Sequence, residues 1–223
     1  MADKPINPIL SGLTESELKD MKEQHCMRGK KYKKGELIFH IGDQIKELGI
    51  VLMGQVIIES IDLWGNKALL SSVPAGQVFA ETYALLNTPI MVNVVAAEDC
   101  HILFINTHIL MQSSFSEKSW QHKLTKNLLA ISTRKNLTLS NRIFCTTSKK
   151  IRGRLLTYLS GYAVQQGKSE FDIPFNRQQL ADFLNLDRSA LSKELCKMRD
   201  EGMLTFRKNH FHLLHVPKEE ESI

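Results

Sequence analysis

The amino-acid sequence predicts an α+β protein built in three consecutive parts: an antiparallel β-sandwich or barrel, a long helix, and a helix-turn-helix followed by a β-wing. Three patterns favour this fold class. Short β-rich runs alternate with glycines over residues 30–107, residues 114–143 lack glycine and proline, and residues 176–204 combine capping residues with apolar positions at helical spacing. The predicted divisions are residues 1–112, 113–145 and 146–223.

The first part is expected to consist of short strands separated by turns, with five β-rich runs. Gly65 and Asn66 suit a tight hairpin, because both residues tolerate positive φ. Ahead of the strands, Thr14 and Glu17 form a capping-box pair that predicts a helix over residues 14–27. The β-rich runs cover residues 37–39, 49–53, 55–58, 68–70 and 92–97.

The second part is predicted to be one amphipathic helix over residues 114–143, about 45 Å long if fully helical. We expect its apolar stripe to pair with the stripe of a second copy, which would make a homodimer; packing within one chain is the alternative. The stripe breaks at residues 132–136, where the polar stretch could instead form a solvated turn. The stripe consists of Trp120, Leu124, Leu128, Ile131, Leu139 and Ile143.

Residues 146–148 (Thr-Thr-Ser) are capping residues ahead of a further helix, which we predict over residues 149–162. The junction between the long helix and this helix is where a hinge between domains is expected, at residues 145–148.

Residues 176–204 predict a helix-turn-helix. Asn176 and Gln179 form a capping box that opens the first helix, and Asp187 caps the second helix after a short turn at residues 185–187. A helical hairpin with a solvated outer face is the alternative. The positions predicted to be buried are Leu180, Ala181 and Leu184 in the first helix and Leu191, Leu195 and Met198 in the second.

The outer face of the second helix is basic or short-chained near its N-terminus, as a helix that enters the major groove requires. Arg188 can bind guanine through two hydrogen bonds, and Lys193 can reach a guanine edge or a phosphate. Ser189 and Ser192 are small enough to allow close approach. Two strands after Gly202 predict a wing, whose basic tip at Lys208 could lie on the phosphate backbone.

The charge distribution agrees with a polyanionic partner for the C-terminal half. Residues 1–112 hold 10 Lys and Arg against 13 Asp and Glu, whereas residues 113–223 hold 19 against 11.

The segments LIFHIGD (37–43), GIVLMGQVII (49–58) and PAGQVFAE (74–81), together with the helix-turn-helix, resemble the Crp/Fnr superfamily of transcription regulators. The resemblance implies a double-stranded β-roll, a dimerisation helix, and a winged helix on a palindromic operator, with recognition helices about 34 Å apart. RNA polymerase is a further candidate partner. The implied base contacts are Arg188, Ser189 and Lys193, and the implied backbone contacts are Arg177 and Gln178.

The sequence departs from cyclic-nucleotide binders at the ligand site. The family's Gly-Glu pair is Ala80-Glu81 here, and its later Arg-Ser or Arg-Thr pair is Met91-Val92. Burying a phosphate without its cation costs about 3–5 kcal/mol, so cyclic AMP is disfavoured. We expect instead an uncharged or weakly acidic small organic effector between the roll and the long helix. Its predicted contacts are Glu81, Tyr83, Met91 and Lys135.

Other chemistry is not indicated, so no cofactor, metal or enzymatic activity is expected. The four cysteines lie far apart without a CxxC pair, which favours reduced thiols over a cluster site. A metal-dependent enzyme or a haem sensor would depend on His40 and His101, and the roll has no HxH or HxxxE motif. A DNA-binding dimer that responds to no effector stays open as an alternative.

The composition, with 43% hydrophobic and 24% charged residues, is that of a soluble protein. No apolar run approaches the roughly 18 residues of a membrane span, and the N-terminal sequence MADKPINPIL has no apolar core of the secretory type. We therefore expect a cytoplasmic protein without a membrane partner.

Overall fold

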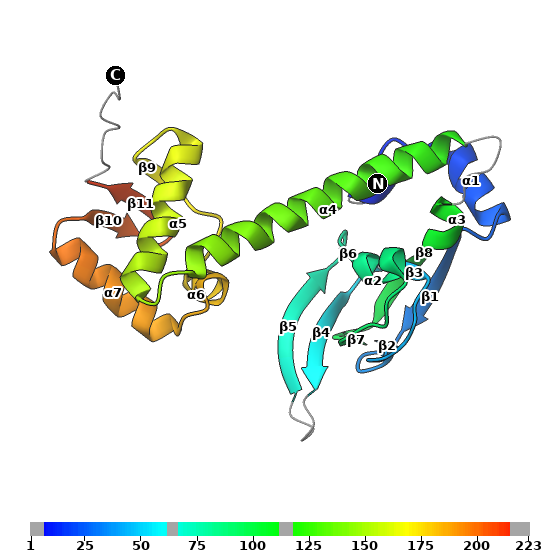
Figure 1. Ribbon diagram of the computed structural model, residues 1–223, viewed down its shortest axis with the longest axis horizontal. Helices are drawn as coiled ribbons and strands as arrows, with labels where there is room; N and C mark the ends of the chain where they lie inside the picture. The colour runs from blue at the N-terminus through cyan, green and yellow to red at the C-terminus, as the bar shows by residue number, and fades with distance from the viewer. Residues whose placement is uncertain (1–6, 62–66, 112–117, 215–223) are drawn as a thin grey trace. The chain divides into compact units, whose positions relative to one another are not determined.

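The computed structural model describes residues 7–61, 67–111 and 118–214 (Figure 1). The chain divides into two compact units, residues 1–133 and 134–223, and each is described by itself. The predicted hairpin at Gly65 and Asn66 lies outside the described residues. Among the described helices, none is both long and apolar enough to cross a membrane.

The first unit is a roll of two four-stranded antiparallel sheets, in the orders β1-β8-β3-β6 and β2-β7-β4-β5. A single buried cluster draws apolar side chains from both sheets. Phe39 is half-buried and packs against this cluster, 6.1 Å from Phe79 and 5.8 Å from Phe104 between ring centroids. The strands are β1 (Met27–Tyr32), β2 (Leu37–Phe39), β3 (Glu47–Met53), β4 (Gln55–Ile61), β5 (Lys67–Pro74), β6 (Val78–Phe79), β7 (Asn93–Ala96) and β8 (Cys100–Asn106).

The five predicted strands are confirmed, and β1, β6 and β8 were not among them. The predicted helix over residues 14–27 was too long: α1 (Glu15–Glu23) has the expected capping box at Thr14, but His25 takes a positive φ of 54° and β1 begins at Met27. Short helices complete the unit, namely η1 (Pro8–Leu10), α2 (Glu81–Leu86) and α3 (Thr107–Met111).

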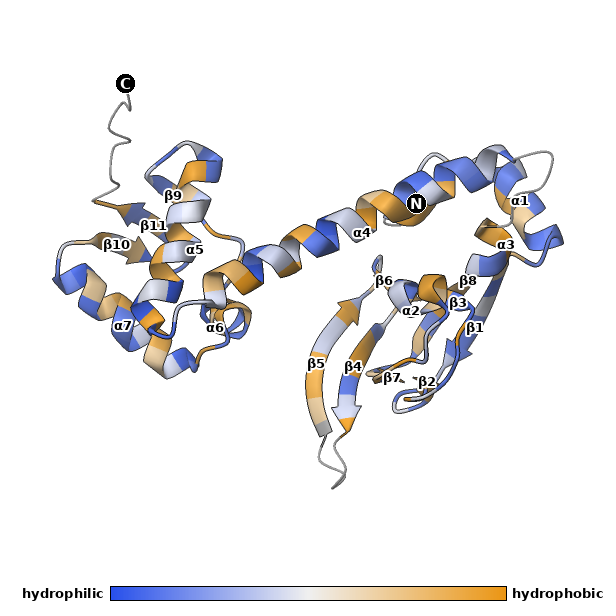
Figure 2. Cartoon of the chain, viewed as in Figure 1, coloured by the Kyte–Doolittle hydropathy of each residue, from blue (hydrophilic) through white to orange (hydrophobic). Residues whose placement is uncertain are grey.

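The long helix is α4 (Ser119–Thr146), and it runs without interruption through the polar residues 132–136. We predicted pairing with a second copy, but for the first half the alternative, packing within one chain, is correct. Trp120, Leu124 and Leu128 are buried in the core of the first unit, and Ile131 packs against it. The second half differs, because Leu139 and Ile143 are 60% and 69% exposed. Apolar positions recur along the whole helix in Figure 2.

Carboxylates of α1 hold the start of α4. Asp20 accepts hydrogen bonds from the Lys118 ammonium at 3.0 Å and from the Trp120 indole at 2.7 Å. Glu17 accepts from the Ser119 hydroxyl and from Lys123 at 2.9 Å. The hydrogen bonds to Glu17, chiefly the one from Ser119, lower the pKa of Glu17 to about 2. The hydrogen bonds to Asp20, chiefly the one from Lys118, lower the pKa of Asp20. Both carboxylates are therefore ionised where α1 meets α4.

The second unit packs helices against the sheet β10-β11-β9 around its own buried cluster, to which Cys145 at the end of α4 also belongs. The predicted caps at Thr146 and Thr147 were wrong, because both hydroxyls donate to carbonyls of the last turns of α4, those of Arg142 and Ile143. Of the three predicted residues, Ser148 does face the next helix: its hydroxyl oxygen accepts from the Lys150 amide at 3.3 Å, although Lys150 itself starts that helix without a side-chain cap. The elements are α5 (Ile151–Gln166), β9 (Glu170–Asp172), α6 (Arg177–Leu184), α7 (Arg188–Asp200), β10 (Leu204–Arg207) and β11 (His210–Leu213).

The residue ahead of α2 carries backbone strain that a substitution should relieve. Ala80 has φ 62° and ψ 8°, a left-handed conformation that costs a residue with a Cβ about 1 kcal/mol. We expect Ala80→Gly to raise the melting temperature of the first unit by about 2–4 °C. Ala84→Gly inside α2 is the control and should lower it, because glycine weakens a helix interior. A lower melting temperature for Ala80→Gly would contradict the assignment.

Candidate nucleic-acid interface

The helix-turn-helix forms as the sequence predicts. Asn176 accepts a hydrogen bond from the Gln179 amide at 2.9 Å, and the Gln179 side chain accepts one from the Asn176 amide, also at 2.9 Å. Asn185 ends α6 with a positive φ of 53°. Asp187 then caps α7 by accepting from the Ala190 amide at 2.9 Å. The caps at Asn176 and Asp187 fix where each helix begins.

All six positions predicted to be buried are buried. Leu180, Ala181 and Leu184 of α6 lie in one cluster with Leu191, Leu195 and Met198 of α7.

The opposite face of α7 is open to solvent. Arg188, Ser189 and Lys193 are exposed and Ser192 is half-buried. The Ser189 hydroxyl donates to Asp187 at 2.5 Å, and this bond is the main reason why the pKa of Asp187 is lowered. The Ser192 hydroxyl donates to the Arg188 carbonyl at 2.8 Å. Because the serine hydroxyls are held against the helix, the two basic side chains project furthest from this face.

Four of the predicted DNA contacts line one concave surface: Arg177 and Gln178 at the start of α6, Arg188 at the start of α7, and Lys208 at the tip of the wing. Lys208 has a positive φ of 56° in the turn between β10 and β11. No acidic residue is among the described lining residues, so the surface is positively charged. The other residues that line it are Pro174, Phe175, Asn176, Gln179 and Asn209.

Arg177 is held in place by aromatic rings of the wing. Its guanidinium lies 4.8 Å from the centroid of Phe206 and 5.1 Å from that of Phe211, and its burial lowers the pKa. Gln178 donates to the Asp182 carboxylate at 2.9 Å. Arg177 therefore packs against the wing in addition to its predicted contact with the DNA backbone. The sequence did not indicate this packing.

Ser192 and Lys193 line a second concave surface further along α7, together with Cys196, Lys197, Asp200 and Glu201. Sequence reasoning did not single out Lys197. Its spacing of four residues from Lys193 would have placed both on one helix face.

The predicted effector contacts differ in their surroundings. Glu81 is buried at the start of α2, Tyr83 packs against the core of the roll, and Met91 is 72% exposed. Lys135 belongs to the other unit. The pocket that joins these four residues stays a prediction.

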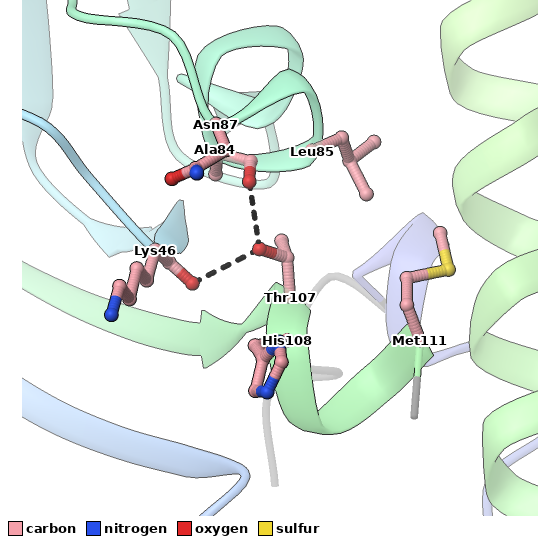
Figure 3. Close-up of a pocket in the computed structure, with 7 residues that line it drawn as sticks. All are labelled: Lys46, Ala84, Leu85, Asn87, Thr107, His108 and Met111. Atoms are coloured by element: carbon pink, nitrogen blue, oxygen red, sulfur yellow. Dashed lines mark hydrogen bonds between the residues drawn. The ribbon is translucent and has the colours of Figure 1, made fainter. Parts of the chain in front are cut away.

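A different concave surface lies between α2 and α3, as Figure 3 shows. The Thr107 hydroxyl lies 3.0 Å from the carbonyls of both Lys46 and Ala84, so its hydrogen is already engaged. None of the predicted effector residues lines this surface. Its lining consists of Lys46, Ala84, Leu85, Asn87, Thr107, His108 and Met111.

Comparison with known families gives two matches in tandem. The family described as cyclic nucleotide-binding domain matches residues 29–113, and the family described as Crp-like helix-turn-helix domain matches residues 153–218. No curated protein matches the chain.

Several solved structures are similar to the chain. CprK complexed with OCPA is 15% identical with a TM-score of 0.56, and the match covers 88% of this chain and 91% of that one. This likeness shows a shared fold. The Catabolite Activator Protein of Thermus thermophilus is 22% identical, with a TM-score of 0.48 and coverage of 92% and 93%. DNR of Pseudomonas aeruginosa is 18% identical, with a TM-score of 0.46 and coverage of 94% and 91%.

His210 of the wing sheet should titrate above its ordinary pKa. Its ring nitrogens lie 3.0 Å from Glu170 and 3.2 Å from Asp172, and these contacts raise the pKa from 6.5. The protonated form is favoured in the folded chain. The added stability is therefore complete below pH 6.5 and is lost as the pH rises through the folded pKa. We expect an NMR titration midpoint above 6.5 that falls in Glu170→Gln; a midpoint at or below 6.5 would contradict this.

Proposed function

Because the chain belongs to the Crp/Fnr family of transcription regulators, we propose that it is a dimeric, sequence-specific DNA-binding regulator controlled by a small organic effector other than cyclic AMP. The observation that carries the proposal is the positively charged concave surface shared by α6, α7 and the wing tip. A phosphate backbone is the ligand that several convergent cations without a carboxylate fit best.

In the proposed complex, the first turns of α7 enter the major groove. Arg188 binds guanine, Ser189 and Ser192 allow close approach, and Lys193 reaches a guanine edge or a phosphate. Two sets of phosphate contacts flank the groove. Arg177 and Gln178 contribute one from the start of α6, and Lys208 contributes the other from the wing.

The second half of α4 supports a homodimer. Leu137, Leu139, Ile143 and Phe144 are 58%, 60%, 69% and 68% exposed, although all are large and apolar. Leu139 and Ile143 are four residues apart, and Leu137 and Phe144 are seven apart, so each pair lies on one side of the helix. A second copy of the helix is the proposed cover for this surface, and two copies would read a palindromic operator.

The effector is proposed to be uncharged or weakly acidic, with Glu81, Tyr83, Met91 and Lys135 as its contacts. The reason is the thioether of Met91 at the position where cyclic-nucleotide binders resembling this chain carry arginine. Effector binding would shift the dimer between two arrangements through the hinge at residues 145–148. A shift from 1:99 to 99:1 needs a preference of about 5.5 kcal/mol. RNA polymerase is the proposed partner on the promoter.

The second candidate is a dimer that binds DNA without an effector. Met91 favours this candidate too, since a roll that lacks the arginine for a cyclic phosphate can serve as structure alone.

Substitutions on α7 test the proposed DNA contacts. Arg188→Ala should weaken operator binding by about 1–3 kcal/mol and relax the preference at one base pair, because a base contact is lost. Lys193→Ala should weaken binding without changing dimerisation. Fluorescence anisotropy with operator variants measures both effects. Unchanged affinity and selectivity in Arg188→Ala would contradict the placement of α7 in the major groove.

A charge on the exposed face of α4 tests the dimer. Leu139→Glu would bury a carboxylate against the second copy, so the variant should sediment as a monomer at concentrations where the natural chain is a dimer. Thr138→Glu is the comparison and should leave the dimer unchanged, because Thr138 is exposed and lies on the side of the helix opposite Ile143 and Phe144. A monomeric natural chain, or a dimeric Leu139→Glu, would contradict the assignment.

A further inference from the structure

The C-terminal end of α6 is capped by arginines from two other helices. The last four carbonyls of a helix have no partner within it and carry the negative end of its dipole. At this end of α6, backbone amides reach the first two carbonyls: Leu186 donates to Ala181 at 2.9 Å and Asn185 to Asp182 at 3.3 Å. The carbonyls of Phe183 and Leu184 accept hydrogen bonds from arginine side chains.

Arg142 of α4 makes a two-point contact with this end. Its Nε donates to the Phe183 carbonyl at 3.1 Å and its Nη2 donates to the Asp182 carbonyl at 3.0 Å. A planar guanidinium that binds two successive carbonyls fixes direction as well as distance, which a single ammonium does not.

Arg154 of α5 caps the neighbouring carbonyls. Its Nη1 donates to Leu184 at 3.0 Å and to Asn185 at 2.9 Å, and its Nε donates to the Ser148 carbonyl at 2.7 Å. Arg154 thus binds both the α4–α5 junction and the turn between α6 and α7.

The same helix α5 also holds α7. Arg152 donates to Glu194 and to Glu201, both at 2.6 Å. Through Arg152 and Arg154, α5 is bound to both helices of the helix-turn-helix, and these three helices form one block. Arg142 connects that block to the end of α4, and every one of these residues belongs to residues 134–223.

We propose that Arg142 is a positioning residue that sets the direction of the helix-turn-helix relative to the end of α4, and thereby the spacing of operator half-sites that the dimer accepts. The proposal rests on the dimer and the DNA binding proposed above. In a dimer held together along α4, the separation of the two α7 helices depends on how each block is attached to its own α4. Arg142 is exposed, so its contact contributes to direction more than to stability.

The experiment measures, in the presence of a cell metabolite extract, the affinity of the full chain for palindromes that share selected half-sites and differ in spacing by single base pairs. The natural chain should prefer one spacing. Arg142→Gln should reduce its discrimination against neighbouring spacings by about tenfold, with unchanged affinity for an isolated half-site. Arg142→Lys should be intermediate, because one ammonium keeps the charge and loses the second contact.

Arg134→Gln is the matched control: Arg134 is an exposed arginine on the same helix, and its variant should discriminate as the natural chain does. Melting temperatures of all variants verify that each is folded. If Arg142→Gln is not folded, Arg142→Lys takes its place in the test. An Arg142 variant with unchanged spacing discrimination would overturn the inference, as would equal losses at every spacing and at the isolated half-site. A natural chain without any preferred spacing would contradict the proposed function itself.

Discussion

The burial of Leu191, Leu195 and Met198 against α6 is the contact on which the proposed DNA interface depends. These three side chains share one face of α7, so their burial turns the opposite face, with Arg188 and Lys193, toward solvent. The caps at either end of the turn then decide where that face starts.

Helix α4 has to serve two surfaces along its length. Its first half is buried in the core of the roll through Trp120, Leu124 and Leu128, and ionised carboxylates of α1 hold it there. Its second half leaves Leu139 and Ile143 exposed while Arg142 is bound to the end of α6. The second half of α4 therefore carries both the proposed dimer surface and the proposed link to the DNA-binding block. This arrangement suits a regulator that transmits a change along one helix.

The helix-turn-helix could be predicted in detail because its signals are local: two capping pairs, one turn, and apolar positions within seven residues of each other. Strand β1 could not, since an edge strand with Arg28, Lys30 and Lys31 exposed has no apolar alternation. The caps at Thr146 and Thr147 were misassigned because a threonine hydroxyl can donate to a carbonyl of the preceding helical turn instead of accepting from the next helix. The arginine caps on α6 are contacts across 30 to 41 residues. No spacing in the sequence indicates such contacts.

Selection of bound sequences from random duplex DNA, with and without a cell metabolite extract, tests the central claim most directly. The account predicts that the purified chain enriches a palindrome and does so only in the presence of the extract. Equal enrichment in both arms would favour the dimer that needs no effector. Absence of enrichment in both arms would contradict the assignment of α7 and the concave surface beside it to DNA.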